Sequence, residues 1–307
     1  MRVAIMAAGA VGGYFGARLA AAGHDVVFFA RGAHLEAIRN NGLKIASVHG
    51  DLHLDNVNAT DDPAGVAPVD LVLFAVKLWD TEHAAAQLRP LVKSHTRVVT
   101  LQNGVDSVER LTPILGPEAV IGGATYVVTT IAEPGVIRQT GTIARIRCGR
   151  TDRRPDPVLA GYVDAAKAAS IDITLSDDML TDLWKKFVLL VGTSGSTAST
   201  RQTVGVIRAD PDMLALMLDL MAEARAVGRA SGVPLGDDFV QELERSIEGF
   251  NPAMKASLAN DLDRGNRLEL DWLAGKVVAL GRKLNVPTPT NAAVYAILKP
   301  YRMGRGR

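Results

Sequence analysis

A glycine-punctuated turn near the N-terminus constrains the fold of this chain more than any other feature. Residues 3–6 form a short apolar run, residues 14–22 have helical spacing, and residues 25–30 form a second apolar run. Gly9, Gly12 and Gly16 lie between the first run and the end of the helical segment. A strand, a glycine-rich turn, a helix and a second strand in this order predict the opening unit of a doubly wound α/β sheet.

The rest of the first half continues the alternation of strands and helices. Apolar runs at residues 71–76, 98–101 and 120–121 are separated by helix-like stretches at 81–91 and 105–115. This pattern predicts a parallel sheet covered by helices on both faces. Residues 43–57 alternate apolar and polar side chains around a Gly-Asp turn, which indicates an inserted hairpin. The β-rich segments of residues 123–149 are expected to extend the sheet.

From about residue 177 onward the pattern becomes helical. Helices are expected at residues 179–200, 211–231, 237–248, 267–284 and 290–299, the fourth with an apolar stripe of Leu268, Trp272, Leu273 and Leu280. We therefore predict a Rossmann domain at 1–176 and an all-helical domain at 177–307, sizes that suit 307 residues. The tail at 302–307 is expected to fray.

Composition excludes several classes of function. Lys and Arg number 34 and Asp and Glu 33, so no net positive field would hold a nucleic acid or an anionic membrane. The single cysteine, Cys148, fits a reducing compartment, and we expect a cytoplasmic protein. Residues 1–22 loosely resemble a secretory signal, but the predicted glycine-rich turn between the first strand and the helix already explains the glycines of this segment. No metal site is expected, and the sequence permits a monomer or a homodimer.

The turn has the residues that a dinucleotide site needs. We expect the cofactor to bind along Ala7, Ala8, Gly9, Ala10, Val11 and Gly12. Gly9 would let the backbone approach a pyrophosphate at the helix N-terminus, and Gly12 would let helix and strand pack closely. Ala7 replaces the first glycine of the pattern, which would cost about 1 kcal/mol if that position needs a positive φ. A glycine-rich turn without a ligand is the alternative.

The end of the second strand indicates which dinucleotide is bound. An acidic residue there would suit the ribose of NAD, whereas this chain has Arg31. A guanidinium makes strong charge-assisted hydrogen bonds to phosphate, which favours NADP(H). Arg31 as an ordinary surface charge is the alternative.

The motifs together resemble one enzyme family, the ketopantoate reductases, or 2-dehydropantoate 2-reductases. The resemblance covers nearly the whole chain and keeps the order of the motifs. It implies a Rossmann domain joined to a helical domain like that of 6-phosphogluconate dehydrogenase, with a small 2-oxo acid bound in the cleft between them. The matching segments are residues 9–16, 30–32, 76–78, 100–104, 184–186 and 257–271.

The resemblance also implies roles for particular residues. Lys186, two places after Trp184, would be the catalytic residue and bind substrate. An ammonium at the carbonyl oxygen would stabilise the alkoxide formed by hydride delivery and supply its proton. Asn103 would contact nicotinamide and substrate, and Lys77 would contact the cofactor. Without the resemblance, Lys77 and Lys186 would be interpreted as surface charges and Asn103 as a turn residue.

The final motif supplies the remaining site residues. By resemblance, Ser257 would bind the substrate, and Glu269, twelve residues later (269 − 257), would bind the substrate hydroxyl and help order the closed site around the cofactor. On the helix of Lys186 the family has asparagines where this chain has Leu190 and Ser194. Ser194 is still expected to line the substrate pocket, with fewer polar donors around it.

Three functions remain open. The first is NADPH-dependent reduction of ketopantoate to pantoate. The second is the same chemistry on a different branched 2-oxo acid, because loss of an asparagine relaxes selection for a hydroxyl. The third is a non-catalytic NADP-binding protein, although such a protein has no use for Lys186, Ser257 and Glu269 together.

Overall fold

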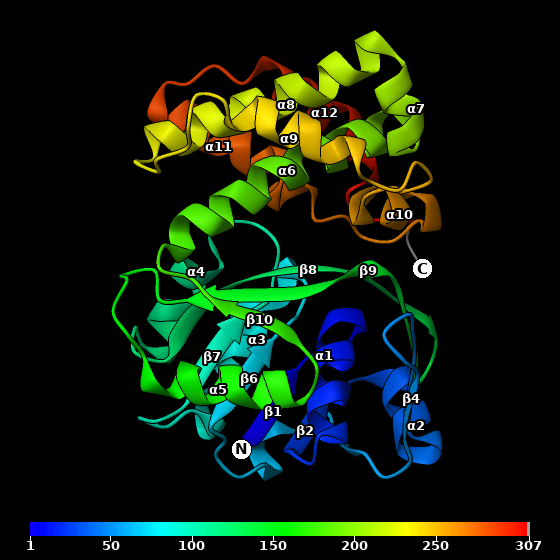
Figure 1. Ribbon diagram of the computed structural model, residues 1–307, viewed down its shortest axis with the longest axis vertical. Coiled ribbons are helices and arrows are strands. Elements are labelled where there is room, and N and C mark those ends of the chain that lie inside the picture. The colour runs from blue at the N-terminus through cyan, green and yellow to red at the C-terminus, as the bar shows by residue number, and fades with distance from the viewer. Residues whose placement is uncertain (306–307) are drawn as a thin grey trace. The chain divides into compact units, whose positions relative to one another are not determined.

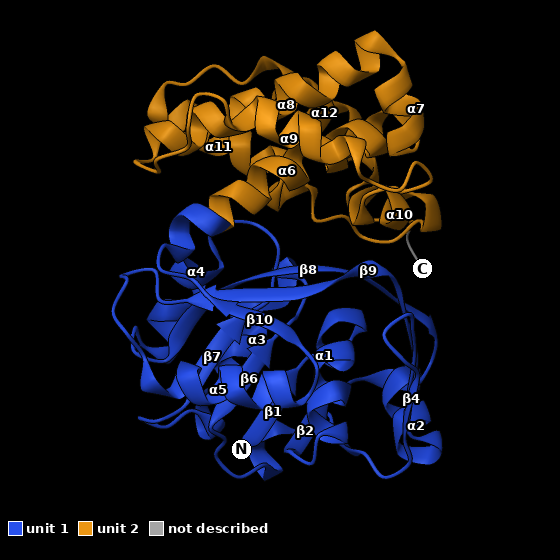
Figure 2. Ribbon diagram, viewed as in Figure 1, with its two compact units in different colours: residues 1–182 blue, residues 183–307 orange. Residues whose placement is uncertain are grey.

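The structure, a computed structural model that describes residues 1–305, consists of two compact units. Unit 1 is Met1–Asp182 and unit 2 is Leu183–Arg307 (Figure 2). The division lies inside helix α6, Met179–Thr200, whereas the sequence analysis placed it at 176/177, before this helix. The predicted fold class, an α/β unit followed by a helical unit, is confirmed.

Unit 1 is built on a single sheet of ten strands (Figure 1). The strands are β1 Arg2–Met6, β2 Asp25–Phe29, β3 Leu43–Ser47, β4 Leu52–Leu54, β5 Asn58–Thr60, β6 Leu71–Phe74, β7 Arg97–Thr100, β8 Val120–Glu133, β9 Val136–Gly149 and β10 Asp172–Leu175. Their order is β4-β3-β9-β8-β7-β6-β1-β2-β5, with β10 paired to β9.

The sheet has a parallel part and a mixed part. Strands β5, β2, β1, β6 and β7 and the start of β8 are all parallel, as the alternation of strands and helices predicted. The long strands β8 and β9 form an antiparallel hairpin, so residues 123–149 do extend the sheet. The predicted hairpin at 43–57 is β3 with β4, and β3 also pairs in parallel with β9.

Helices cover both faces of the parallel part. Alternate residues of β1 point to opposite faces: Val3 and Ile5 join the core formed with α1 and α5, and Ala4 and Met6 join the core formed with α3. The helices of unit 1 are α1 Ala10–Ala21, α2 Gly32–Asn41, α3 Thr81–Leu88, α4 Ser107–Leu115 and α5 Pro157–Ala168, with short 3-10 turns η1 Pro63–Gly65, η2 Leu78–Asp80 and η3 Arg89–Leu91.

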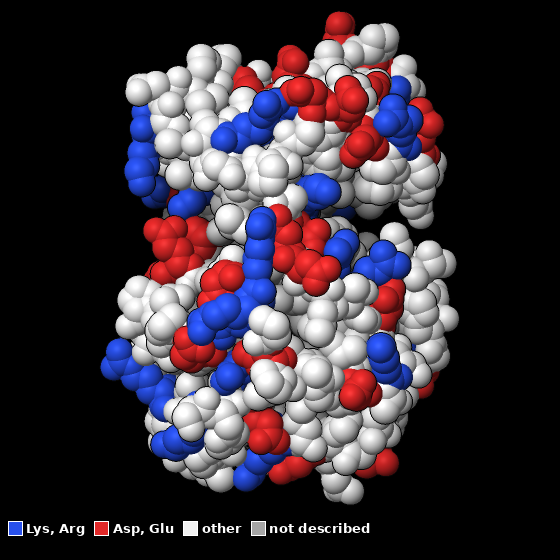
Figure 3. Space-filling model, turned by 60° about the vertical axis from the view of Figure 1, so that its left-hand side comes forward, with Lys and Arg blue, Asp and Glu red and all other residues white. Residues whose placement is uncertain are grey.

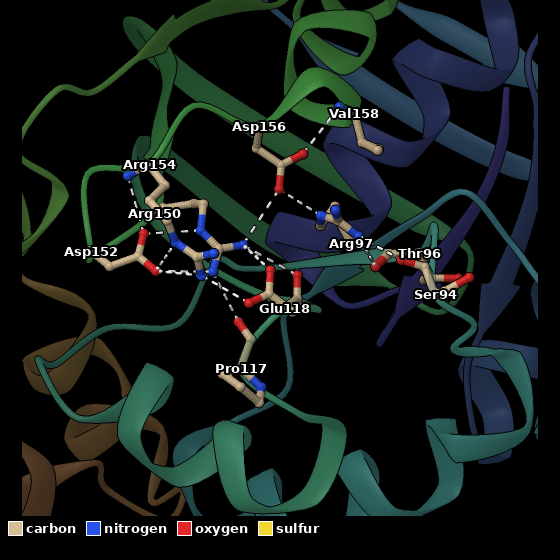
Figure 4. Close-up of polar contacts among 10 residues, drawn as sticks. All are labelled: Ser94, Thr96, Arg97, Pro117, Glu118, Arg150, Asp152, Arg154, Asp156 and Val158. Atoms are coloured by element: carbon tan, nitrogen blue, oxygen red, sulfur yellow. Dashed lines mark hydrogen bonds and ion pairs between the residues drawn. The ribbon is translucent and has the colours of Figure 1, made fainter.

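Ion pairs hold the start of α5 to the sheet (Figure 4). Asp156 caps α5 by accepting a hydrogen bond from the Val158 N–H at 3.0 Å. Its other carboxylate oxygen accepts from Arg97 Nε at 2.6 Å and lies 3.5 Å from Arg150 Nη1. The Asp156 side chain is 2% exposed, so its charge depends on these partners. The network thus links the start of α5 to β7 and to the residue that follows β9.

Unit 2 has helices and no strand within residues 183–305. Beyond α6 it contains α7 Val204–Ala209, α8 Pro211–Ala230, α9 Phe239–Glu248, α10 Ser257–Arg264, α11 Ala274–Leu284 and α12 Pro289–Leu298, with 3-10 turns η4 Leu270–Trp272 and η5 Lys299–Tyr301. Helix α8 is central and contacts α7, α9, α11 and α12. It also packs closely on α6, where a Cβ added at Gly195 would meet Leu220 at 2.8 Å.

Two expectations for unit 2 are wrong. The helix expected at 267–284 is interrupted, because Leu273, with φ −108° and ψ −103°, separates the turn η4 from α11. The tail is also tied down as far as residue 305: Arg302 accepts a hydrogen bond from the Leu268 N–H, and the Arg305 N–H donates to Gly265, both at 2.9 Å. Residues 306 and 307, also expected to fray, lie outside the described residues.

The surface charge agrees with the balanced composition. Basic and acidic side chains lie next to one another in both units on the face drawn in Figure 3. Among residues 1–305, none of the helices combines the length and the apolar character that crossing a bilayer requires.

Candidate active site

The turn between β1 and α1 presents backbone groups at the start of a helix. Gly9 is the N-cap of α1, no side chain caps this end, and the first turn contains no acidic residue. The first N–H groups of a helix lack intrahelical partners and attract anions. A Cβ added at Gly9 would meet nothing within 4 Å, so the space in front of the helix is open. This end of α1 therefore fits the pyrophosphate of a dinucleotide.

The other residues of the turn hold it against the sheet. The N–H of Ala8 donates to the carbonyl of Phe29 in β2 at 2.7 Å. A Cβ at Gly12 would collide with the Ala7 carbonyl oxygen and lie 2.9 Å from Ile5, so only glycine fits there. Ala7 does not have a positive φ: the non-glycine residues with positive φ among 1–305 are Arg153, Ser170, Arg201 and Asn285. The cost expected from replacing the first glycine is therefore not incurred.

Arg31 lies beside this turn, at the end of β2. It is the N-cap of α2 and is exposed, and its Nη2 donates to Oε1 of Gln87 at 3.2 Å. A single hydrogen bond leaves most donors of this exposed guanidinium available to a further partner. Arg31 can therefore reach a phosphate group carried by a ribose at this edge.

Lys77 and Asn103 come from the two neighbouring loops at the same edge. Lys77 follows β6, is exposed, and has its Nζ 5.8 Å from the centre of the Trp79 ring. Asn103 follows β7 and is partly buried. Because β1, β6 and β7 are parallel neighbours, their carboxyl ends bring both side chains to the edge where α1 begins.

Gln102 ties these two loops together, and the sequence analysis did not assign it a role. It is 6% exposed, and its Nε2 donates to the Val76 carbonyl at 3.1 Å and to Thr81 Oγ1 at 2.9 Å. Its Oε1 accepts from Thr100 Oγ1 at 3.2 Å. Gln102 thus fixes the loop of Lys77 relative to that of Asn103. Its place beside Asn103 after a strand was the available signal.

In unit 2, α6 carries a buried amine. Lys186 is 7% exposed, whereas its neighbour Lys185 is exposed. Burial lowers the pKa of Lys186 to about 8, and the negative charge of Glu269 opposes this shift. Glu269 is also 7% exposed and lies just before η4. Unit 2 therefore brings Lys186 and Glu269 together, as an acid whose pKa is close to neutral and a carboxylate near it.

Ser194 continues the face of Lys186 with an unsatisfied hydroxyl. It is 1% exposed, and its Oγ has no hydrogen-bond partner among residues 1–305. Leu190, partly buried, lies one helical turn from both Lys186 and Ser194. The other hydroxyls in this half of α6 bond to the carbonyl four residues earlier: Thr193, Ser196, Thr197, Ser199 and Thr200. Ser194 alone in this series keeps a donor for another partner.

Ser257 occupies a different environment from Glu269. It is the exposed first residue of α10, whereas Glu269 is buried in the segment between α10 and η4. Ser257 is therefore an exposed helix position, whereas Glu269 is buried outside a helix. The sequence analysis expected one helix across 267–284 and so placed Glu269 in a helix, whereas Glu269 lies in a non-helical segment.

Comparison with known proteins shows the same family along the whole chain. Residues 3–153 match the family described as "Ketopantoate reductase PanE/ApbA", and residues 178–302 match its C-terminal part. A 2-dehydropantoate 2-reductase of Mesorhizobium japonicum is 33% identical over 100% of this chain and 99% of its own. A crystal structure of a PanE/ApbA family ketopantoate reductase from Ralstonia eutropha has a TM-score of 0.90 and 36% identity, covering 98% of both chains.

A further solved structure is similar in fold. D-mandelate dehydrogenase, solved as a ternary structure with NADH and anilino(oxo)acetate, has a TM-score of 0.90, covering 98% of both chains. It is 18% identical in sequence, so the two chains share the fold.

Two alanine substitutions should separate the two roles of the glycines. Gly9→Ala should leave the thermal midpoint unchanged, because its Cβ enters open space, yet weaken dinucleotide binding at least about tenfold by lengthening N–H contacts to phosphate. Gly12→Ala should lower the thermal midpoint by several degrees, because its Cβ meets backbone. Thermal unfolding and fluorescence titration with NADPH and NADH measure both. Wild-type affinity in Gly9→Ala would contradict the assignment of this turn.

Proposed function

Because the chain belongs to the ketopantoate reductase family, we propose that it reduces 2-dehydropantoate to pantoate with NADPH, using Lys186 as the general acid. The family makes the protein an oxidoreductase that uses a pyridine nucleotide. The product pantoate places the proposed activity in pantothenate biosynthesis. The observation that carries the proposal is the buried amine of Lys186 next to the charge of Glu269.

Lys186 has the charge and acidity that ketone reduction needs. When bound, the nicotinamide supplies the hydride that adds to the carbonyl carbon. Negative charge then develops on the carbonyl oxygen, and the Lys186 ammonium stabilises this charge and transfers a proton from Nζ to the oxygen. With a pKa of about 8, Lys186 is mostly protonated at neutral pH and still gives up its proton more readily than an exposed lysine.

Three other residues are proposed to hold the substrate. Glu269, a buried carboxylate, would accept a hydrogen bond from a substrate hydroxyl. Ser257, exposed at the start of α10, would donate its hydroxyl to the substrate carboxylate. Asn103, at the carboxyl end of β7, would contact both nicotinamide and substrate.

The dinucleotide is proposed to be NADPH. The turn of residues 7–12 would bind the pyrophosphate through its backbone, and Lys77 would contact the cofactor from the loop after β6. Arg31 would bind the 2′-phosphate, because its guanidinium is exposed and makes one hydrogen bond, to the side-chain amide of Gln87. No carboxylate stands at the end of β2 to favour the ribose of NAD instead.

A different branched 2-oxo acid is the second candidate substrate. Leu190 places an apolar side chain between the amine of Lys186 and the unpaired hydroxyl of Ser194. An apolar group at this place cannot recognise a substrate hydroxyl, whereas it suits an alkyl branch. Ser194 would then supply the hydrogen bond on this face of α6. A non-catalytic NADP-binding protein, the third function considered, would give no role to a buried lysine beside a buried glutamate.

Replacing Lys186 with methionine should remove catalysis and spare cofactor binding. Lys186→Met should lower kcat by about 10²- to 10⁴-fold, the range for loss of a general acid, and leave the Kd for NADPH within about twofold. Lys185→Met is the matched control, since it removes an adjacent, exposed amine. NADPH oxidation with 2-dehydropantoate and with other branched 2-oxo acids measures turnover on both candidate substrates. Unchanged kcat in Lys186→Met would refute the catalytic role.

Reversing the charge at Arg31 should change the choice of cofactor. Arg31→Asp should weaken NADPH binding about 10- to 100-fold, because it removes a charge-assisted hydrogen bond and adds repulsion. NADH affinity should hold or rise, since the aspartate can accept from the ribose hydroxyls. Parallel titrations with both dinucleotides measure the ratio. Equal NADPH affinity in the variant and the wild type would contradict the assignment of Arg31 to the 2′-phosphate.

A further inference from the structure

We propose that His34 is a positioning residue for the dinucleotide turn: a neutral imidazole that ties Ala8 to α2 and to the tip of the β8–β9 hairpin. Two hydrogen bonds define this bridge. The Gly135 N–H donates to His34 Nδ1 at 3.0 Å, and His34 Nε2 lies 2.9 Å from the Ala8 carbonyl oxygen. The inference rests on the proposed dinucleotide binding and not on the choice of 2-oxo acid.

The partners of His34 determine its protonation state. A backbone N–H can only donate, so Nδ1 must be the unprotonated acceptor of Gly135. The remaining nitrogen, Nε2, then carries the proton and donates to the Ala8 carbonyl. An imidazolium would direct an Nδ1–H at the Gly135 N–H and lose that bond. Burial lowers the pKa of His34 from its ordinary 6.5, which favours the required neutral ring.

The bridge fixes the peptide that precedes the N-cap of α1. The Ala8 N–H is already held by Phe29 in β2 at 2.7 Å, and His34 holds its carbonyl from the other side. Gly9, the N-cap of α1, follows directly, and the N–H groups at this end of the helix are proposed to bind the pyrophosphate. Anchoring Ala8 at both polar groups orders the turn before the ligand arrives, which reduces the entropy lost on binding.

The far end of the bridge is itself fixed. The Gly135 carbonyl accepts from the Lys44 N–H in β3 at 2.9 Å. Gly135 has φ +78°, and a Cβ added there would lie 3.1 Å from Ala37 in α2. The hairpin tip is thus packed on α2 and hydrogen-bonded to β3. His34 therefore connects the dinucleotide turn to a hairpin tip that α2 and β3 hold in place.

Three variants of His34 separate the two hydrogen bonds. Glutamine reaches far enough to donate an amide N–H to Ala8 and cannot titrate. Asparagine is shorter, and its oxygen can accept only from Gly135, while alanine removes both bonds. His95→Gln is the matched control, because His95 is exposed near Asp70, at the amino-terminal edge of the sheet.

The test is the Kd for NADPH at pH 8, measured by fluorescence titration without any 2-oxo acid. We expect His34→Ala and His34→Asn to raise the Kd about tenfold, as loss of ordering hydrogen bonds predicts, and His34→Gln to stay within about threefold of wild type. The control should be unchanged. At saturating NADPH, the kcat for 2-oxo acid reduction should equal that of wild type in all variants. Circular dichroism and the thermal midpoint show that each variant is folded.

Two results would overturn the inference. One is an unchanged Kd in both His34→Ala and His34→Asn. The other is an equal loss of affinity in all three variants that follows their loss of thermal stability, since glutamine would then rescue nothing. Failure of the proposed function is distinguishable: if wild type binds NADPH but reduces no 2-oxo acid, the substrate assignment fails while the role of His34 stands. If wild type binds neither dinucleotide, both fail.

Discussion

The chemistry proposed for this protein depends on a lysine amine kept charged in a buried place. Removing an ammonium from water disfavours its charged form, and at Lys186 this effect outweighs the attraction of Glu269. The result is a pKa of about 8 rather than the ordinary 10.5. Such a group is charged at neutral pH and acidic enough to donate its proton. A buried lysine without Glu269 would be deprotonated more readily, and a fully exposed one would be a weaker acid.

Unit 1 meets a different constraint, which is to present backbone rather than side chains. The end of α1 has an uncapped glycine, open space in front of it and no acidic residue in its first turn. Gly12 allows the turn to close on Ala7, and Gln102 and His34 fix the neighbouring loops and the turn by hydrogen bonds. The turn and the loops proposed to bind the dinucleotide are thus held in place by hydrogen bonds from Gln102 and His34.

Local patterns predicted those features that local physics determines. The glycines at 9 and 12 and the apolar runs around them gave the first strand, turn and helix, and the position of Arg31 at the end of β2 followed. The prediction of one helix at 267–284 was wrong because Leu268 and Trp272 do not form one helical face. Leu268 packs from a loop and Trp272 packs from a 3-10 turn. Gln102 and His34 were missed because the contacts that define their roles join segments far apart in the sequence: Gln102 bonds to Val76 and Thr81, and His34 bonds to Ala8 and Gly135. The hydroxyl of Ser194 was visible in the sequence, but its lack of a partner was not.

The pH dependence of kcat/KM for 2-oxo acid reduction tests the central claim most directly. If Lys186 is the general acid, kcat/KM should be constant at neutral pH and fall about tenfold per pH unit above a pKa of about 8, because only the ammonium can donate. A rate that stays constant up to the ordinary lysine pKa of 10.5 would show that the buried amine of Lys186 does not supply the proton.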